Sequence, residues 1–455
     1  MSAPLPTAFA VPLADLGLWT PRAAYLLGRN RCDWPTRPLR EIVRVRFEVV
    51  PEDEIEASTT HLLDRISFDE GRIHAGKRQV TRMTQYRACP GDLVVSKINA
   101  RKRAIGLMPD GPDIGVSIHF RALVPTSQDV DPVFLWRALR SSYCRAQFDA
   151  ATGGIGKGEI SEENLLNVRV PVPPLDVQRA IVAHAAHAEA EAAALLADAD
   201  AVEAAFESTV EATLGLPPSP PRRQLQAFAL TWADIERWGV AFLKASANAL
   251  DLSAGHFPAE RLDSLLLGLQ YGTSVKANTT GQGEVVIRMN NLQNGLLDLR
   301  NIKHVSFSEE EAERLYLCPG DILINRTNSK ELVGKCAVFN ETGRYVFASY
   351  LIRARVDTAL ALPEYIALVI NGRIGRQQID RMSRPIGGQA NINSEEIRSI
   401  KIPLPPLDVQ AQIVADVQAV RARAAALRAE ARTRRRTAAA EVEAMLLGTA
   451  PPPTA

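Results

Sequence analysis

The chain has 455 residues, more than one ordinary hydrophobic core can organise, so at least two domains are expected. Its composition, 46% hydrophobic and 23% charged, is typical of a globular protein, and no apolar run reaches the length of a membrane span, so no membrane partner is expected. The formal net charge of +1 excludes a uniformly basic chain but allows a basic face balanced by acidic charge elsewhere.

The first part of the chain predicts a mixed domain. A Pro-Gly-Asp turn at Pro90 leads into "DLVVSKI", which predicts a strand, and "DPVFLWRALRSSYCRAQF" from Asp131 predicts one helix. We therefore expect an α+β domain over residues 1–170, with a curved and mostly antiparallel sheet.

A long helix is predicted next. The phrase "PVPPLDVQRAIVA" starts at Pro171; its diproline cannot continue a helix, and Asp176 stands where an N-cap belongs. An alanine-rich run follows to Leu214, with apolar residues at heptad spacing. The predicted seam consists of Ile181, Ala188, Leu195, Val202 and Thr209, interleaved with Ala185, Ala192, Ala199, Phe206 and Thr213. We assign residues 171–216 to this helix as a spacer.

The second half repeats the same order. "ACPGDLVVSKIN" from Ala88 returns as "LCPGDILINRTN" from Leu317, and the proline phrase returns as "PLPPLDVQAQIVA" from Pro403. Between them, "GEVVIRMNNLQNG" from Gly283 predicts a strand closing on an Asn-Gly turn, and "PEYIALVINGRIGRQQI" from Pro363 predicts one helix. The sequence thus predicts a second α+β domain over residues 217–402 and a tandem repeat of two large units.

The two predicted long helices are complementary in charge. Residues 176–212 hold eight acidic residues and one basic residue, a net charge of −7, whereas residues 408–446 hold seven basic and five acidic residues, a net charge of +2. The second helix, within a spacer over residues 403–447, has the seam Ile413, Val417, Val420, Ala424, Leu427, Ala431, Ala438 and Met445 behind a predicted N-cap at Asp408. We predict an intramolecular antiparallel coiled coil; two separately solvated helices are the alternative. Residues 448–455 are predicted to be a disordered tail.

No catalytic motif emerges from the chain. No diproline follows an Asn or Asp as in adenine methyltransferases, and no lysine has the acidic residue two positions before it that a common nuclease site needs. "GGIGKG" at Gly153 lacks the Ser or Thr of a phosphate loop, so Lys157 is interpreted as a residue of a flexible loop near DNA phosphate, or of a plain loop. His184 and His187 predict a solvated pair rather than a metal site. Cys89 and Cys318 share a repeat position and are expected to be small packed residues. We expect no catalytic residue, metal or cofactor in this chain.

DNA contacts are predicted for the loops after the two repeated strands. Arg can bind guanine with two hydrogen bonds, Asn can bind adenine, and Lys mainly binds phosphate. Basic residues and Asn recur at this repeat position, which favours DNA binding over an ordinary basic surface loop. In the first unit the candidates of this loop are Lys97, Asn99, Arg101, Lys102 and Arg103, and Lys157 of the "GGIGKG" segment is a candidate outside it. In the second unit the candidates of this loop are Asn325, Arg326, Asn328 and Lys330, and the candidates outside it are Tyr271, Thr273, Lys276, Arg288, Asn290, Gln389 and Asn391.

The layout resembles the specificity subunit of type I restriction-modification systems. The shared features are the doubled entry "VPVPPLDVQRAIV" and "IPLPPLDVQAQIV", each between a globular unit and a long helix, and "LDSLLLGLQYGTSVKA" near the start of the second unit. The first 90 residues depart most, because they lack a clear "YGT" equivalent. The resemblance implies two target recognition domains joined by antiparallel coiled-coil helices that read an asymmetric, bipartite site in double-stranded DNA.

The same resemblance implies partners. Two adenine methyltransferase subunits would bind the chain and carry S-adenosylmethionine, and nuclease/translocase subunits are further partners that it allows. A non-catalytic coiled-coil scaffold that binds only protein is the alternative; such a scaffold would show no salt-dependent, sequence-selective binding of DNA. Five scattered cysteines without a CxxC and an N-terminus without a signal-peptide pattern predict a cytoplasmic protein.

Overall fold

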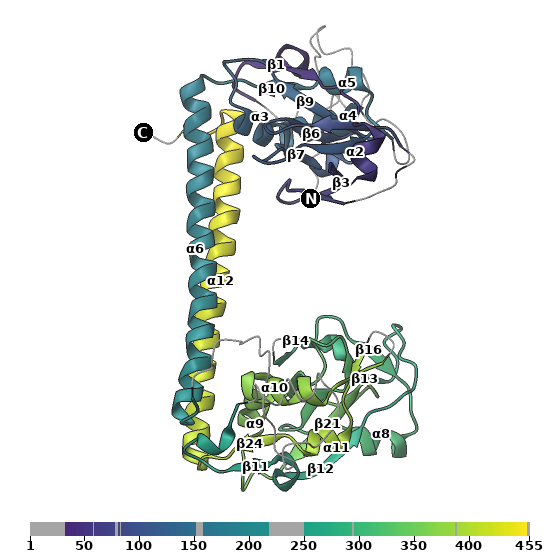
Figure 1. Ribbon diagram of the computed structural model, residues 1–455, viewed down its shortest axis with the longest axis vertical. Coiled ribbons are helices and arrows are strands. Elements are labelled where there is room, and N and C mark those ends of the chain that lie inside the picture. Colours follow the sequence, from purple (N-terminus) through teal and green to yellow (C-terminus); the bar gives the residue numbers. More distant parts are fainter. Residues whose placement is uncertain are drawn as a thin grey trace, which may run out of the picture. The chain divides into compact units, whose positions relative to one another are not determined.

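The computed structural model describes residues 32–57, 59–77, 81, 83–151, 158–217, 250–293, 295–386 and 389–452. The chain divides into two compact units, residues 1–195 with 429–455 and residues 196–428. Each unit combines one globular α+β domain with part of each of the two long helices (Figure 1). The predicted fold class, α+β domains with long paired helices, is confirmed.

Two four-stranded sheets build the domain of the first unit. The sheet β2-β9-β6-β7 is antiparallel throughout, whereas β4-β3-β8-β5 contains one parallel pair, β3 with β8. The strands are β2 Val43–Val45, β3 His61–Ile66, β4 Ile73–Gly76, β5 Gln85–Ala88, β6 Leu93–Ser96, β7 Ile105–Leu107, β8 Ile114–Ser117 and β9 Phe120–Pro125.

The second unit repeats this arrangement. Its sheet β12-β21-β17-β19 is antiparallel, and its sheet β16-β13-β20 again contains one parallel pair, β13 with β20. A hairpin β14-β15 and a sheet β18-β23-β22 are added. The strands are β12 Leu266–Tyr271, β13 Glu284–Ile287, β14 Leu292–Gln293, β15 Leu296–Leu297, β16 Lys303–Val305, β17 Ile322–Asn325, β18 Thr327–Asn328, β19 Cys336–Val338, β20 Tyr345–Phe347, β21 Leu351–Val356, β22 Arg384–Ile386 and β23 Gln389–Asn391.

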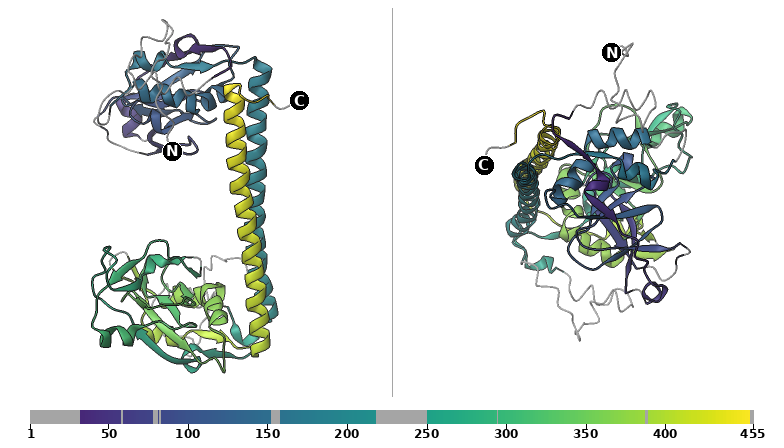
Figure 2. Two further views of the ribbon diagram at one scale, coloured as in Figure 1. Left: turned by 180° about the vertical axis from the view of Figure 1, so that it is seen from behind. Right: turned by 90° about the horizontal axis from the view of Figure 1, so that it is seen from above.

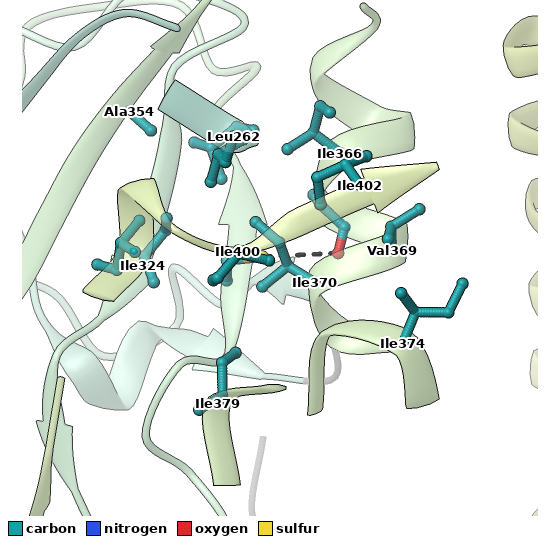
Figure 3. Close-up of a cluster of buried hydrophobic side chains, with 14 of the residues drawn as sticks. Leu262, Ile324, Ala354, Ile366, Val369, Ile370, Ile374, Ile379, Ile400 and Ile402 are labelled. Carbon is teal, nitrogen blue, oxygen red and sulfur yellow. Dashed lines mark hydrogen bonds between the residues drawn. The ribbon is translucent and has the colours of Figure 1, made fainter. Parts of the chain in front are cut away.

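The repeated strand is central because both of its faces are buried. In β6, Leu93 and Val95 join one hydrophobic cluster while Val94 joins another. In β17, Ile324 joins the large cluster drawn in Figure 3 and Leu323 joins a second. Burial on both faces explains why these strands are continuous apolar runs rather than alternating ones.

The short helices differ from the prediction, because each predicted helix is two helices. In the first unit, Ser141 interrupts the run and its Oγ accepts a hydrogen bond from the backbone N–H of Cys144, which starts a new helix. In the second, Gly372 is extended, with φ −75° and ψ 178°. The helices are α2 Glu52–Glu56, α3 Pro132–Leu139, α4 Ser142–Ala151, α5 Glu162–Leu166, α8 Glu309–Leu315, α9 Pro363–Asn371, α10 Arg373–Met382 and α11 Ser394–Arg398.

A short antiparallel strand pair closes each domain where it meets the proline phrase. In the first unit β1 Thr36–Pro38 pairs with β10 Arg169–Pro171, and in the second β11 Ala259–Arg261 pairs with β24 Lys401–Pro403. The strand that leads into each long helix is therefore anchored to the beginning of the same domain.

The long helices are α6 Leu175–Thr213 and α12 Leu407–Leu447. Asp176 and Asp408 lie in the first turn rather than at the N-cap, because the carbonyls of Pro174 and Pro406 already accept the first helical hydrogen bonds. An acidic side chain in the first turn still interacts favourably with the helix dipole.

Much of the predicted seam is buried within each unit, and Leu195, Val202, Phe206, Val420 and Leu427 are half-buried. Ile181, Ala185, Ala188 and Ala192 are buried in the first unit, as are Ala431, Ala438 and Met445 opposite them. Ala199, Ile413, Val417 and Ala424 are buried in the second unit. The seam fails at Thr209 and Thr213, which are exposed and whose hydroxyls donate to carbonyls one turn back. In both units α6 and α12 run side by side in opposite directions (Figure 2).

The C-terminal end departs from the predicted disordered tail. The backbone N–H groups of Thr449 and Ala450 donate to the carbonyl of Ala444, and Ala450 packs on a hydrophobic cluster of the first unit. Residues 453–455 lie outside the described residues. Among the helices that the structure describes, none combines the length and the apolar character that a membrane crossing requires.

Candidate nucleic-acid interface

The predicted contact loops occupy equivalent places in the two sheets. The first loop follows β6 and leads to β7, and the second follows β17 and leads to β19. The same backbone hydrogen bond closes both: Ser96 N–H donates to Ala104 C=O at 3.0 Å, and Asn325 N–H donates to Lys335 C=O at 2.8 Å. Equivalent placement follows from the repeat and does not by itself identify a ligand.

A buried aspartate fixes the turn before each repeated strand. Asp92 and Asp321 are 2% and 3% exposed. Each carboxylate accepts a hydrogen bond from the backbone N–H of the cysteine three residues earlier, at 2.9 Å in both units. A buried carboxylate requires a counter-charge, and arginines supply it in both units. The shared cysteine position is thus part of this turn. Burial raises the pKa of the half-buried Cys89 thiol, whereas Cys318 is exposed, so the expectation of a packed cysteine is wrong for the second unit.

The side chains of the first loop divide into engaged and accessible groups. Lys97 Nζ lies 3.0 Å from the Glu159 carboxylate, so its charge is already partnered. The carbonyl of Asn99 accepts from Lys102 and Ala104 N–H groups and shapes the turn. Arg101 is half-buried, whereas Lys102 and Arg103 are exposed. Lys157 lies outside the described residues.

The second loop joins candidates from three distant segments. The Arg326 guanidinium lies over the Tyr271 ring, 5.0 Å from its centroid, and the Tyr271 hydroxyl accepts from Ser394 N–H at 3.1 Å. Thr327 Oγ1 donates to Asn391 Oδ1 at 2.6 Å, which ties β18 to β23. The structure therefore brings Tyr271, Arg326 and Asn391 into one region of the second domain.

The remaining candidates of the second unit are less uniform. Asn325 is 2% exposed, so its side chain belongs to the interior end of β17 rather than to the surface. Asn328 Nδ2 lies 3.5 Å from the sulfur of Met289, beside the exposed Asn290. Arg288 donates to Asn301 C=O at 2.8 Å. Lys276 and Lys330 are exposed, Thr273 is half-buried in a β-bridge with Ala348, and Gln389 begins β23.

Two residues of the repeated phrase were not predicted to have a role. Gln178 and Gln410 are fully buried near the starts of α6 and α12. Gln178 accepts from Asp131 N–H at 2.9 Å and donates to Asp129 and Pro173 carbonyls at 2.9 and 2.8 Å. Gln410 accepts from Leu362 N–H at 2.9 Å and donates to Leu360 and Pro405 carbonyls at 3.2 and 2.8 Å. The sequence signal for this role was the glutamine at the same position of both repeated proline phrases.

These glutamines dock each long helix on the N-terminal end of a short helix of the domain that precedes it, α3 in the first unit and α9 in the second. A carboxylate from the far end of the other long helix docks on the next short helix. Glu443 of α12 accepts from Ser142 N–H at 2.6 Å at the start of α4, and Glu207 of α6 accepts from Arg373 N–H at 2.8 Å at the start of α10. Each domain is thus fixed to both long helices within its own unit.

The predicted charge complementarity of the long helices is confirmed within each unit. In the second unit Arg428 pairs with Asp200 and Glu203, both at 2.8 Å. In the first unit Arg434 pairs with Glu191 at 2.6 Å and Arg435 with Glu189 at 2.5 Å.

The two histidines of the "HAAH" motif on α6 each lie beside a glutamate of the long helices. His184 Nε2 lies 2.9 Å from Glu441, whereas the side chain of His187 is 74% exposed and lies 3.4 Å from Glu191. Across the part of the chain that the structure describes, no group of three or more His, Cys, Asp or Glu residues is arranged to hold a metal ion.

Comparisons with known proteins agree with this architecture. A family model described as "Type I restriction modification DNA specificity domain" matches residues 271–431. The EcoKI specificity subunit of Escherichia coli (strain K12) is 26% identical over 337 residues, and the StySPI specificity subunit of Salmonella potsdam is 21% identical over 336 residues. Each alignment covers 72% of this chain and 67% of the relative.

A solved chain from a study of "complex assembly and conformational transition of the type I R-M system" is similar in fold. Its TM-score is 0.56 at 17% identity, and the alignment covers 91% of this chain and 96% of that chain. At this level of identity the similarity concerns the fold alone.

Proposed function

We propose a function from the premise that the chain belongs to the specificity subunits of type I restriction-modification systems, the family on which its domain match and its curated relatives agree. It is a DNA-recognition subunit and not itself an enzyme; the protein-only scaffold is not favoured. In detail, each α+β domain reads one half of a bipartite, asymmetric target in double-stranded DNA.

One observation carries the bipartite reading. The two domains share strand order and loop placement, yet the loops have different sequences, "KINARKR" and "RTNSKE". A symmetric dimer with identical readers would bind a palindrome. Two different readers on one repeated scaffold support two unlike half-targets instead.

The proposed partners are inferred from the same repeat. Two methyltransferase subunits would bind, one for each repeat, and they would methylate adenine. Nuclease/translocase subunits would join in complexes that cleave, and the assembly would act in the cytoplasm. S-adenosylmethionine would bind the methyltransferase subunits, so titration calorimetry of the isolated chain with this cofactor should give no saturable heat. Tight binding to the isolated chain would contradict this assignment.

A domain exchange tests the two-reader model. Residues 1–168 are replaced by the equivalent unit of a relative, and methylated adenines are mapped in cells that also express the methyltransferase subunits. One half of the target should change while the other half and the gap between them persist. The matched control exchanges residues 250–402, which should change only the other half. If either exchange alters both halves, the domains do not read independently.

The paired helices are proposed to set the gap between the half-targets. Inserting four residues after the exposed Ala197 lengthens α6 by ~6 Å and rotates the rest of this helix by ~40° relative to the seam. We expect the same half-targets with a gap longer by roughly two base pairs at ~3.4 Å each. The control adds four residues after Glu430 as well, which restores the pairing of α6 with α12. If the variant with the single insertion is active and its target has an unchanged gap, these helices do not set the distance between the half-targets.

A further inference from the structure

Arg103 has an unusual backbone conformation in the first contact loop. Its φ is +66°, and it is the single non-glycine residue at positive φ among the described residues. The backbone hydrogen bond from Ser96 to Ala104 in the first unit is equivalent to the one from Asn325 to Lys335 in the second. The residues that precede the two acceptors, Arg103 and Gly334, are therefore counterparts. Gly334 has φ +78°. The repeat therefore requires a left-handed residue here, and only the second unit meets the requirement with glycine.

The backbone of Arg103 is held tightly. Its N–H donates to Ala100 C=O at 2.8 Å, and its C=O accepts from Ile105 N–H at 2.8 Å and from Arg140 Nη1 at 2.5 Å. Arg140 follows the last residue of α3, and its guanidinium lies 5.4 Å from the Trp136 ring centroid. The strained conformation is thus imposed by the surrounding structure rather than adopted by a free loop.

Arg140 joins this loop to a second one. Its guanidinium also donates to the carbonyls of Ile105, Phe68 and Asp69 at 3.2, 3.1 and 2.5 Å. Arg376 of α10 holds the other contact loop in a comparable way, through the carbonyls of Val333 and Lys330 at 2.5 and 3.2 Å. In both units, therefore, an arginine on or next to a short helix donates hydrogen bonds to backbone carbonyls of the contact loop: Arg140 after α3 and Arg376 on α10.

The Arg103 side chain has no structural explanation of its own. It is exposed and, within the described residues, its guanidinium makes no hydrogen bond or ion pair. Its charge also opposes a neighbouring one: burial, followed by the charges of Arg103 and Arg137, lowers the pKa of Arg140 to about 10. Arg140 remains charged at neutral pH, so two guanidinium groups repel each other. Strain and repulsion at one exposed residue are consistent with selection for a contact outside the chain.

We infer that Arg103 is a specificity-determining residue of the first domain, whose guanidinium reads the edge of a guanine in its half-target, with Arg140 as the positioning residue. This inference rests on the proposed function. A guanidinium held in a fixed direction can donate two hydrogen bonds to guanine O6 and N7, which an ammonium group cannot do.

Three variants of Arg103 separate the side chain from the backbone. Glycine adopts the left-handed conformation without strain, so Arg103→Gly keeps the loop and removes the guanidinium. Arg103→Ala keeps the strain and also removes the guanidinium. Arg103→Lys keeps the strain and the charge. The full chain is assembled with its methyltransferase subunits, and competition binding is measured with duplexes substituted at each target position.

We expect all three variants to lose about 10-fold or more of the preference for guanine at one position of the first half-target. Arg103→Gly should also raise the unfolding midpoint by ~2–4 °C, whereas Arg103→Ala should not. Preferences within the second half-target should be unchanged. The control Lys102→Ala should weaken binding to all duplexes equally and reduce the salt dependence.

Arg140→Lys tests the positioning role. It should weaken the same guanine preference while leaving the second half-target unaffected; an equal loss on every duplex would overturn that role. If Arg103→Gly or Arg103→Lys keeps every base preference of the wild type, Arg103 is not a base-reading residue. A wild-type complex without sequence-selective binding would instead overturn the proposed function, and this inference with it.

Discussion

The two domains bury the same aspartate but supply its counter-charge from different strands. Asp92 receives two hydrogen bonds from Arg46, just after β2, at 2.7 and 3.1 Å. Asp321 instead has Arg355 at 3.0 Å and Arg353 at 3.6 Å, both on β21. Position 355 is an arginine in the second unit, whereas the residue at the same strand register in β9 is Val124. The repeat therefore preserves the carboxylate and the turn, while the cation can move between adjacent strands.

Because different arginines pair with the aspartate in the two units, the positive charge is buried to different depths. The side chain of Arg353 is 6% exposed, whereas that of Arg46 is 19% exposed. In the first unit the residue at the same strand register as Arg353 is Ala122, which carries no charge. The second unit therefore depends more strongly on its aspartate than the first, because an uncompensated charge costs more where water is excluded.

The largest loss of stability is expected from substitution of the more deeply buried pair. Asp321→Ala should lower the free energy of unfolding by about 3–5 kcal/mol, because it leaves Arg353 buried without its carboxylate. Asp92→Ala should cost about 1–3 kcal/mol, since Arg46 can reach water. Urea unfolding of the full chain measures both, with the Asp→Asn variants as controls that keep an acceptor for the cysteine N–H. If the two variants lose equal unfolding free energy, the exposure of the paired arginine does not determine the cost of removing the aspartate.

For the buried glutamines, unlike the aspartates, we expect the same substitution to destabilise the two units equally. Gln178→Ala and Gln410→Ala each remove three hydrogen bonds and leave buried backbone groups without partners. Each should lower the free energy of unfolding by ~2–3 kcal/mol. Gln412→Ala is the control on the same helix, because Gln412 is exposed, and it should have almost no effect. A large difference between Gln178 and Gln410 would mean that the two docking sites are not equivalent.

Glycines at the ends of the long helices distinguish the two units again. Gly215 and Gly448 have φ +70° and +75°, as expected where a helix ends in a left-handed residue. A Cβ on Gly215 would overlap the His256 ring, whereas one on Gly448 would lie 3.1 Å from Trp34 Nε1. Gly215→Ala should therefore cost ~2 kcal/mol and Gly448→Ala ~1 kcal/mol of unfolding free energy.

Gly91→Ala isolates the backbone cost in the same measurement. Gly91 has φ +83°, and a Cβ there would meet nothing within 4 Å. Calorimetric unfolding of all three variants should rank Gly215→Ala as the most destabilising. If Gly91→Ala matches it, steric overlap with His256 plays no part.

The smallest effect concerns the helix ion pairs. The hydrogen bond from Arg428 lowers the pKa of Glu203, so this pair stabilises the protein above the unfolded pKa of Glu, about 4.3, and is lost as the pH falls through the lower folded value. Arg428→Ala should therefore reduce stability by only ~0.5 kcal/mol at pH 7, because the pair is largely exposed. The loss should decrease as the pH is lowered from 7 through the folded pKa of Glu203, and also in 1 M salt, as measured by urea unfolding. A loss that persists in both conditions would indicate packing rather than charge.

The large-scale organisation could be predicted from the residues alone. The repeat is written in the sequence, so the two units and the order of their elements could be predicted. The seams of α6 and α12 and their opposite charges follow a local period that a helix preserves, so their pairing could be predicted too. The seam failed at Thr209 and Thr213 because spacing alone does not identify where packing against a partner ends.

The details of the candidate interface depend on tertiary packing. The start of α10, where Arg373 N–H donates to Glu207, and the contact of Arg326 with Tyr271 both involve residues distant in the sequence. The burial of Asn325 likewise becomes visible only in the folded domain. The left-handed conformation of Arg103 could not be predicted, because an arginine has no local preference for it and the contacts of Arg140 impose it. Local patterns determine which elements form, whereas the packing of one element on another determines which side chains remain exposed and in what direction they point.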